Sequence, residues 1–505
     1  MIKTNDDKTS NGMSNPKLIF YGGVGSTTGA NIMYEYGGHK ILIDCGLLQG
    51  ARFAEEKNFE PFKYNPADVD FLLITHAHMD HIGRVPKLVR SGFKGKIIST
   101  KETMELALPM LTDALKVMQT RHPDKTLFED RDIAKTFSLW EGRNYEEKIE
   151  LFDNCFLEMQ DAGHVLGSAI MVLSSPLASR DPLLDKEREG KKIKIAFTGD
   201  LGNSPSPLLP DTEFPKDVDY LVMESVYGDR NHESKSERRE KLKKAILDGI
   251  KRGGTIVMPA FSIERTQVLL YEINNMVEDK EIPQIPVFLD SPLAEKVTDI
   301  YKKYQKDFKE SVKKEIKEGD DIFDFPGLRI VGRASESAEI EKISGAKIIL
   351  AGSGMSEGGR VVNHEAHYLP DPKATIILVG YQSVGTLGRR IQDGAKEIEI
   401  FKDGKMERLK KEKIKVRATI ENITGYSSHK DSEHLLEFVE KVNTLTSPLA
   451  SRDPLLDKER VGRGLKRVFV IMGEPKSSLF LTQRLRDYLD VDAIYPEENR
   501  EYELT

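Results

Sequence analysis

The stretch that decides the fold is T-H-A-H-M-D-H-I-G, at Thr75–Gly83. His76 and His78 alternate directly after an apolar run, and Asp80 and His81 follow where a helix is expected to begin. Three imidazoles and one carboxylate within six residues are too dense for a single tetrahedral metal site to use every group. This order of ligands, in a strand–loop–helix context, predicts two adjacent metal ions rather than a chance histidine cluster in a surface turn.

Other polar residues that could take part in catalysis or metal binding also stand at the ends of short apolar runs. Asp44 ends the run I-L-I-D, and Asp200 closes I-A-F-T-G-D. From residue 16 to residue 230, short β-branched runs are broken by Gly, Asp and Pro, which is typical of a layered α/β domain. Functional residues at strand ends are usual in such folds.

The rest of the chain divides into an insertion and a return to the first domain. At 505 residues the chain is long enough for about two to four domains. In the second section amphipathic helices, one of them expected over residues 293–315, alternate with apolar strands. This alternation implies parallel pairing in a second α/β domain. We expect a disordered polar lead-in, a first domain in two parts and a domain inserted between them: residues 1–15, 16–230 with 409–505, and 231–408.

The composition predicts a soluble, cytoplasmic protein. No apolar run approaches the roughly 20 residues of a membrane span, and the N-terminus lacks the basic and apolar segments of a signal peptide. The two cysteines, Cys45 and Cys155, exclude a disulfide framework and cysteine zinc fingers, and they indicate a reducing compartment. The net charge of -7 argues against a broad cationic surface for duplex DNA, and we interpret the lysine-rich stretches Tyr301–Lys317 and Lys402–Lys415 as solvated faces.

One string, S-P-L-A-S-R-D-P-L-L-D-K-E-R, occurs twice, at Ser175–Arg188 and Ser447–Arg460. Fold repeats keep a pattern rather than an identity and recur at a regular period, so this duplication is not one of them. Each copy stands just before a predicted strand, where a connecting loop is expected and insertion is tolerated. We interpret both copies as exposed loop insertions without a catalytic role.

Four motifs in order carry a resemblance to a known family. They are I-L-I-D-C-G with Asp44, the histidine cluster, D-A-G-H-V-L-G-S-A with His164, and F-T-G-D-L-G with Asp200. With them the chain resembles the metallo-β-lactamase superfamily, specifically its β-CASP nuclease branch of the bacterial RNA-processing type, similar to RNase J and to the mRNA cleavage and polyadenylation endonuclease. The resemblance covers about Pro16 to Thr505, apart from the two repeated segments. It implies a four-layered αββα sandwich with an inserted α/β (β-CASP) domain.

The resemblance also implies how metal ions would be held. One zinc ion would take His76, His78 and His164, and a second would take Asp80 and His81. Asp200 would bridge the two ions, and Asp44 would orient ligands from behind. The expected cofactors are therefore two Zn²⁺ ions.

Two further motifs place the chain in the β-CASP branch. Glu224 in V-M-E-S-V-Y-G-D-R-N-H matches the acidic motif, and His429 in T-G-Y-S-S-H-K-D matches the histidine motif. In such enzymes the acid orients an imidazole that can protonate the leaving oxygen, while the metal ions activate water and neutralise charge. The expected catalytic residues are Asp80, Glu224 and His429.

A glycine-rich stretch predicts contact with the nucleic-acid backbone. G-S-G-M-S-E-G-G-R, at Gly352–Arg360, directly follows a predicted strand, and its glycines would let backbone N–H groups approach a phosphate. Arginines and serines elsewhere are weaker candidates for the same groove, since each could equally be a cap or a salt-bridge residue. The expected substrate-binding residues are Ser353, Gly354, Arg360, Ser262, Arg265 and Arg389.

The chain departs from the RNA-processing pattern near its end. Relatives have V-H-G-E where this chain has V-F-V-I-M-G-E-P, which places Met472 at the histidine position. A thioether is a poor zinc ligand, so three consequences compete. The second ion could be bound more weakly, another metal such as Mn²⁺ could occupy that site, or the enzyme could act on DNA, because DNA-processing members also lack this histidine. The first consequence is favoured.

The leading functional hypothesis is a ribonuclease that prefers single-stranded RNA and hydrolyses its phosphodiester bonds with water activated by two zinc ions. Its rivals are a DNA nuclease of the same branch, a hydrolase of a small thioester or lactone, and a non-catalytic RNA-binding scaffold. RNA is the expected partner, with no membrane. Endonucleolytic and 5′→3′ exonucleolytic cleavage both stay open. A homodimer is a candidate assembly by resemblance, although no heptad or apolar stripe indicates one.

Overall fold

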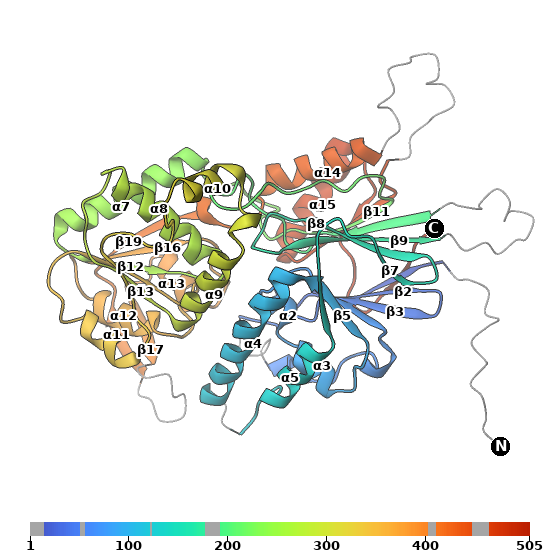
Figure 1. The fold of residues 1–505 in the computed structure, drawn as a ribbon, viewed down its shortest axis with the longest axis horizontal. Helices are drawn as coiled ribbons and strands as arrows, with labels where there is room; N and C mark the ends of the chain where they lie inside the picture. The colour runs from blue at the N-terminus through green and yellow to red at the C-terminus, as the bar shows by residue number, and fades with distance from the viewer. Residues whose placement is uncertain (1–14, 51–55, 122–123, 177–191, 402–410, 447–463) are drawn as a thin grey trace, which may run out of the picture.

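Two seven-stranded sheets pack face to face and form the core of the first domain (Figure 1). The computed structural model describes residues 15–50, 56–121, 124–176, 192–401, 411–446 and 464–505. The first sheet has the order β22-β1-β2-β3-β4-β5-β6, with β1 Lys17–Gly22, β2 Asn31–Tyr36, β3 His39–Ile43, β4 Phe71–Leu73, β5 Lys96–Thr100, β6 Trp140–Arg143 and β22 Glu501–Glu503. The second has the order β21-β20-β11-β10-β9-β8-β7, with β7 Ile149–Phe152, β8 Cys155–Asp161, β9 Ala169–Pro176, β10 Lys192–Phe197, β11 Tyr220–Glu224, β20 Arg467–Ile471 and β21 Ala493–Ile494.

Alternation along the strands separates the inside of this sandwich from the outside. In β1 every second residue is buried, so Leu18 and Phe20 point into the space between the sheets. There they join one apolar cluster with residues of the second sheet, such as Met171 and Ile195. The outer faces are covered by α3 Val85–Arg90, α4 Lys101–Arg121 and α5 Asp130–Ser138 on the first sheet, and by α14 Ser432–Thr446 and α15 Pro475–Leu489 on the second. The four layers confirm the αββα sandwich predicted from the sequence.

The inserted domain is built on a six-stranded sheet with the order β14-β13-β15-β12-β16-β19, and all of its strand pairs are parallel. The parallel pairing predicted from alternating helices and strands is thus present. The strands are β12 Thr255–Pro259, β13 Val287–Asp290, β14 Leu328–Ile330, β15 Lys347–Ala351, β16 Thr375–Val379 and β19 Thr419–Ile423. The helices are α7 Lys235–Arg252, α8 Arg265–Glu278, α9 Pro292–Lys303, α10 Glu310–Lys317, α11 Ala334–Ile340, α12 Val361–Tyr368 and α13 Leu387–Gln392, and a hairpin of β17 Glu397–Phe401 and β18 Lys411–Lys415 completes the domain.

Two boundaries differ from those expected. The inserted sheet ends with β19, which pairs with β16, so the insertion extends past residue 408. A single helix expected over residues 293–315 is instead α9, a short 3-10 turn and α10. The chain breaks there because Phe308 turns into the core and the backbone N–H of Lys309 donates to the carbonyl of Leu208 in the first domain. Apart from Ser175 and Pro176 in β9, the duplicated segments lie outside the described residues.

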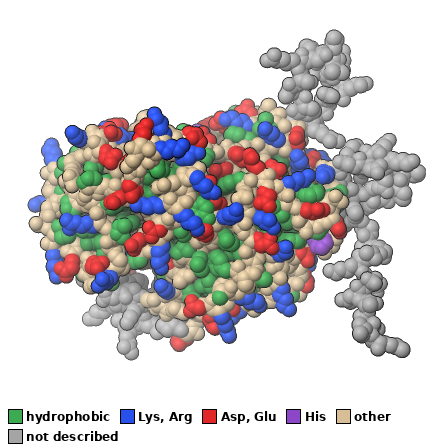
Figure 2. Space-filling view, viewed as in Figure 1, with side chains coloured by type: hydrophobic (Ala, Val, Ile, Leu, Met, Phe, Trp, Pro, Cys, Tyr) green, Lys and Arg blue, Asp and Glu red, His purple; other side chains and the backbone are tan. Residues whose placement is uncertain are grey.

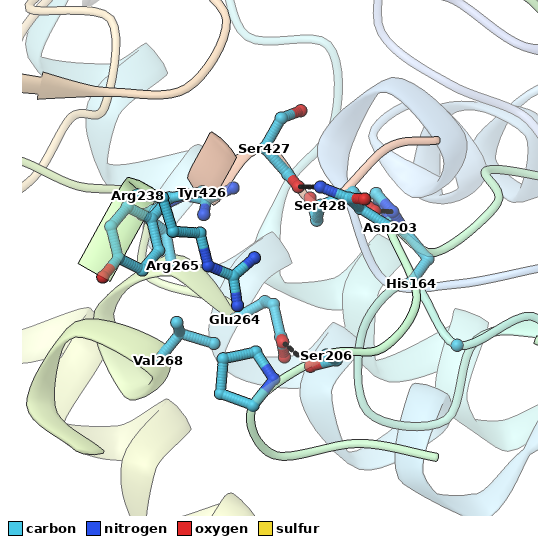
Figure 3. Close-up of a pocket in the computed structure, with 12 residues that line it drawn as sticks. His164, Asn203, Ser206, Arg238, Glu264, Arg265, Val268, Tyr426, Ser427 and Ser428 are labelled. Atoms are coloured by element: carbon cyan, nitrogen blue, oxygen red, sulfur yellow. Dashed lines mark hydrogen bonds between the residues drawn. The ribbon is translucent and has the colours of Figure 1, made fainter. Parts of the chain in front are cut away.

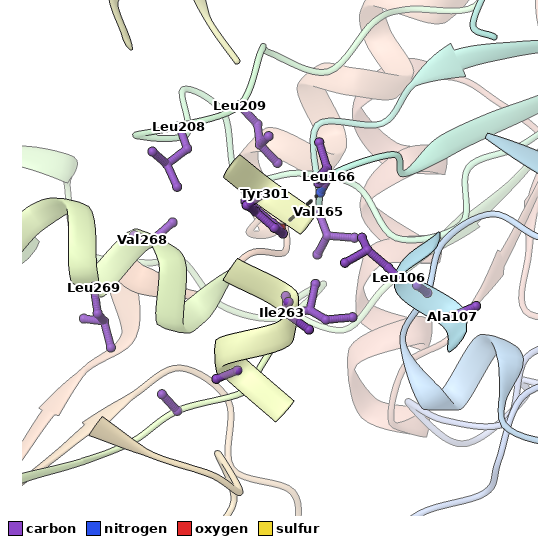
Figure 4. Close-up of a cluster of buried hydrophobic side chains, with 14 of the residues drawn as sticks. Leu106, Ala107, Val165, Leu166, Leu208, Leu209, Ile263, Val268, Leu269 and Tyr301 are labelled. Atoms are coloured by element: carbon purple, nitrogen blue, oxygen red, sulfur yellow. Dashed lines mark hydrogen bonds between the residues drawn. The ribbon is translucent and has the colours of Figure 1, made fainter. Parts of the chain in front are cut away.

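A continuous apolar cluster joins the two domains (Figure 4). Leu106 of α4 and Leu166 pack with Ile263 and Tyr301 of the inserted domain. The buried Tyr301 hydroxyl accepts from the backbone N–H of Leu166 at 3.2 Å and donates to Glu264 at 2.8 Å. Because full burial of such side chains stabilises by roughly 1.5–3 kcal/mol each, the domains are held in one arrangement rather than joined by a loose hinge.

The surface carries mixed charge. On the face shown in Figure 2, lysines and arginines are interspersed with acidic residues over both domains. Within the described part of the chain, none of the helices combines the length and the apolar character that crossing a membrane requires.

Candidate metal centre and active site

The loops that follow parallel strands bring the predicted ligands to one edge of the sandwich. Asp44 follows β3 and His76 follows β4, while Asp200 follows β10 and Glu224 ends β11. Close backbone approach at a glycine holds two of these loops together, since a Cβ on Gly202 would lie 1.9 Å from the carbonyl oxygen of Gly163. The Asp200 loop therefore packs directly against the loop that carries His164.

The first group of ligands consists of three imidazoles and one carboxylate. His78 Nδ1 lies 3.1 Å from His76 Nε2 and 3.2 Å from His164 Nε2. Asp200 Oδ2 lies 3.4 Å from His76 Nε2 and 3.6 Å from His164 Nε2. One ligand atom from each of the four residues lies within 4.8 Å of all the others, and His76, His164 and Asp200 are buried.

A second group shares the same aspartate. Asp200 Oδ1 lies 3.4 Å from His81 Nε2, which is 3.9 Å from Asp80 Oδ2. Both Asp200 Oδ1 and His81 Nε2 are buried without a hydrogen-bond partner in the described structure. The two oxygens of Asp200 thus face two different ligand groups, as a carboxylate that bridges two ions would.

The donor chemistry fits divalent cations. Burial and the neighbouring imidazoles hold the pKa of His78 and of His164 well below the ordinary value of histidine, so both rings are neutral and offer a lone pair. Buried polar atoms without partners are costly in a protein interior. A metal ion on each ligand group would satisfy the orphaned atoms of Asp200 and His81, and imidazole with carboxylate is a donor set that suits zinc or manganese.

Asp44 lies behind the second group and orients it. Its Oδ2 is 2.7 Å from His81 Nδ1 and accepts from the Thr75 hydroxyl at 2.8 Å, and its Oδ1 accepts from the Thr75 backbone N–H at 2.8 Å. With Nδ1 engaged in this way, His81 presents Nε2 to the cluster. The motif comparison anticipated this role for Asp44, whereas the part played by Thr75 has no signal in the sequence beyond its place before His76.

Glu224 and His429 form a buried acid–imidazole pair beside the cluster. Both oxygens of Glu224 lie 3.1 Å from His429 Nδ1, and the His429 ring centroid is 4.7 Å from that of His164. Burial disfavours the charged imidazole, but Glu224 and Asp200 outweigh it and raise the pKa of His429 to about 9. His429 is therefore charged at neutral pH. Its Nδ1 contacts Glu224, and its Nε2 takes no part in that contact.

Comparison with known proteins identifies the family of this arrangement. Residues 27–164 match the Metallo-beta-lactamase superfamily, and residues 266–391 match the Beta-Casp domain. The chain is 31% identical over 462 residues to Ribonuclease TTHA0252 of Thermus thermophilus, covering 89% of this chain and 99% of that protein. The chain belongs to the metallo-β-lactamase superfamily, in its β-CASP nuclease branch.

Other relatives agree with this placement. An RNase J-like protein of Methanocaldococcus jannaschii is 30% identical, with 84% of this chain and 89% of that protein covered. The transcription termination factor FttA of Methanosarcina mazei is also 30% identical, with 80% of this chain but 61% of that protein covered. Among solved structures, a protein of unknown function from Enterococcus faecalis shares the fold with a TM-score of 0.50 at 12% identity, covering 97% of this chain and all of that one.

The predicted substrate residues of the β-CASP domain have different surroundings. The Arg360 guanidinium donates to Asp290 at 2.6 Å and to the carbonyls of Val331 and Gly332, and Arg389 pairs with Asp393 at 2.9 Å. Both side chains therefore have partners within the β-CASP domain, and their contact with a substrate stays a prediction. The remaining predicted residues lie in the glycine-rich loop or around the start of α8: Ser353, Gly354, Ser262 and Arg265.

Met472 directly follows β20 and packs as an apolar side chain. It is 2% exposed and belongs to the cluster between the two sheets, and its backbone N–H donates to the carbonyl of Gly23 at 2.7 Å. Together with Asp44, His81 and Glu224 it lines a small cavity. This position is next to the second ligand group but supplies no nitrogen or oxygen donor to it.

Proposed function

We propose that this chain is a metal-dependent ribonuclease that hydrolyses phosphodiester bonds of single-stranded RNA. The observation that carries the proposal is the shared position of Asp200, between two ligand groups and beside the Glu224–His429 pair. Similarity over nearly the whole length of Ribonuclease TTHA0252 supports RNA as the substrate. An inserted domain fixed against the sandwich argues against a hydrolase of small thioesters or lactones, because such a substrate needs no second wall of this size.

His76, His78, His164 and Asp200 would hold one ion, and Asp80, His81 and Asp200 the other. We propose zinc at both positions, with manganese an alternative at the second. When bound, two such ions polarise the phosphate and lower the pKa of an attacking water. The second position has fewer protein ligands, and Met472 adds none.

The protein groups then account for the proton that the leaving oxygen needs. Water adds to phosphorus, the bond to the 3′ oxygen breaks, and His429 gives its proton to that oxygen; solvent later restores it. Glu224 holds the imidazole in place through Nδ1 and stabilises its charge. The products would be a 3′-hydroxyl and a 5′-phosphate.

The limited exposure of the centre supports the proposed preference for a single strand. Only 19% of the Asp80 side chain and 19% of the His429 side chain reach solvent, whereas Asp200 and Glu224 are fully buried. A centre with so little of its surface exposed would admit one strand more readily than a duplex with its partner strand in place.

The direct test is cleavage of matched 5′-labelled single-stranded RNA and DNA, in zinc and in manganese, with Asp80→Ala as the control. We expect RNA to be cleaved by the unmutated protein alone. Cleavage of DNA alone would instead support the DNA nuclease that Met472 suggests, and cleavage of neither would remove the nuclease proposal. The product ladder separates internal from stepwise cutting.

Compartment and assembly are further parts of the proposal. Cys45 and Cys155 are both free and buried, which suits a reducing compartment such as the cytoplasm. A homodimer stays a prediction, and light scattering of the purified protein measures it.

A further inference from the structure

A partly open cavity lies next to the metal centre, where the two domains meet (Figure 3). His164 and Asn203 of the sandwich line one side of it, and Arg238, Arg265 and Tyr426 line the other. His164 lines this cavity and also belongs to the first group of ligands, so the cavity adjoins that group.

Arg265 is the unusual residue of this cavity. It is 6% exposed, yet its guanidinium makes no hydrogen bond or ion pair with any residue that the structure describes, and its Nε is buried without a partner. Burial lowers the pKa of Arg265 to about 10, which still leaves it charged at neutral pH. A buried and unpaired positive charge is costly, and proteins keep such groups where a ligand completes them.

Arg238 adds a second positive charge on the same side. It is 6% exposed, donates once to the carbonyl of Gly425 at 2.9 Å, and lies over the ring of Tyr426 with 5.0 Å between guanidinium and ring centre. Its Nε is also buried without a partner. Arg238 and Arg265 are near enough for repulsion, which contributes to lowering the pKa of Arg265.

Glu264, the acid with the largest electrostatic effect on Arg265, does not balance these two charges. Glu264 is engaged by the Tyr301 hydroxyl at 2.8 Å and by the Ser206 hydroxyl at 3.4 Å, and it has no ion pair within the described structure. Burial raises the pKa of Glu264 to about 7, so at neutral pH it carries only part of a negative charge. The cavity is therefore positive overall.

Neighbouring arginines show that the protein pairs such charges elsewhere. Arg239, the next residue along α7 from Arg238, lies 2.7 Å from Glu281 and 3.3 Å from Glu272. Arg360 is paired with Asp290. Arg265 thus differs from Arg239 and Arg360, which have carboxylate partners, and it lines the cavity that also includes the ligand His164.

We propose that this cavity is a phosphate subsite, in which Arg265 and Arg238 bind a phosphate group of the RNA next to the one at the metal centre. This inference rests on the proposed function. The planar fork of a guanidinium matches the oxygens of a phosphate and forms charge-assisted hydrogen bonds with it. Inorganic phosphate offers the same chemistry and would occupy the same cavity.

The first experiment measures thermal unfolding of the metal-loaded protein with and without inorganic phosphate. Because Arg265 is unpaired in the free protein, Arg265→Met should unfold at the same temperature as the unmutated protein or at a higher one. Phosphate should raise the unfolding temperature of the unmutated protein and of Arg239→Met, but raise that of Arg265→Met much less. Arg239→Met is the matched control, since it removes a paired arginine of the same domain outside the cavity.

The second experiment measures RNA cleavage by the same proteins. Loss of two charge-assisted hydrogen bonds predicts a rise in KM for RNA of about tenfold or more in Arg265→Met, with a smaller change in kcat. Arg265→Lys should recover part of the loss, because it restores charge without the planar fork. Inorganic phosphate should compete with RNA in the unmutated protein and compete less well in Arg265→Met.

Two results would overturn the inference. If Arg265→Met unfolds at a lower temperature while its response to phosphate and its KM are unchanged, the arginine is structural. If phosphate stabilises the unmutated protein but not Arg265→Met, while no RNA is cleaved, then the anion site exists and the RNA assignment fails together with the proposed function.

Discussion

The active site has one wall from the αββα sandwich and one wall from the β-CASP domain, and the two walls use their charged side chains in different ways. On the sandwich wall, histidines and aspartates converge until one ligand atom from each lies within 4.8 Å of the others in its group. On the β-CASP wall, Arg360 and Arg389 are tied to carboxylates of their own domain, and Arg265 alone of these three faces a cavity unpaired. The first wall offers ligands that suit metal ions, and on the second the proposed phosphate subsite depends on an arginine without a partner among the described residues.

The largest effect is expected on the sandwich wall. Asp200→Ala removes the carboxylate shared by both ligand groups, so we expect RNA cleavage to fall by at least about a thousandfold. Metal content measured by mass spectrometry should fall in the same sample. Full metal content with lost activity would mean that Asp200 acts otherwise than as a bridging ligand.

The next effect concerns the acid–imidazole pair between the walls. His429→Ala removes the proton donor, and general acid catalysis predicts a loss of about a hundred- to ten-thousandfold in kcat. Metal content should stay unchanged, which separates this loss from that of Asp200→Ala. A substrate with a better leaving group should recover much of the activity, and failure to do so would assign His429 to positioning or to metal binding.

Arg360 tests the comparison between the walls most sharply. Asp290 is fully buried, so Arg360→Ala leaves its carboxylate with only His364 and Ser337 as partners and should lower the free energy of unfolding by about 3 kcal/mol. The exposed pair of Arg389 with Asp393 provides the control, because Arg389→Ala should change stability by less than about 1 kcal/mol. Denaturant unfolding measures both. If Arg360→Ala instead raised the KM for RNA and left stability unchanged, Arg360 would be a substrate-binding residue.

The smallest effect is expected on metal affinity at Met472, where the chain departs from the family pattern. Met472→His supplies an imidazole next to the second ligand group, and its backbone φ of 49° is one that histidine adopts more readily than most residues. We expect tighter binding of the second ion by about tenfold. Met472→Leu keeps an apolar side chain and should leave the affinity unchanged. Equal affinities in both variants would show that position 472 does not reach the metal.

The same contrast explains how far the sequence could predict the structure. The metal ligands follow from dense motifs at strand ends, where the sheet order leaves little freedom in their position, and the four layers follow from the alternation of burial in strands such as β1. The end of the inserted domain did not follow, because β19 is a short strand that could pair with either sheet.

The surroundings of individual arginines were harder to predict from the sequence. Arg265 and Arg360 look alike in sequence, and only the packing of α8 and α12 decides which one finds a carboxylate. Arg238 carried no motif at all and was missed, since its role depends on α7 meeting the turn at Gly425 and Tyr426. Helix packing, rather than local pattern, sets these contacts.

The most direct test of the central claim is a titration of zinc into metal-stripped protein, with bound metal and RNA cleavage measured at each step. The structure predicts that binding reaches two ions per chain and that cleavage appears mainly with the second, which has fewer protein ligands. Full cleavage with one ion per chain, or in the presence of a chelator, would contradict a centre in which Asp200 joins two metal ions.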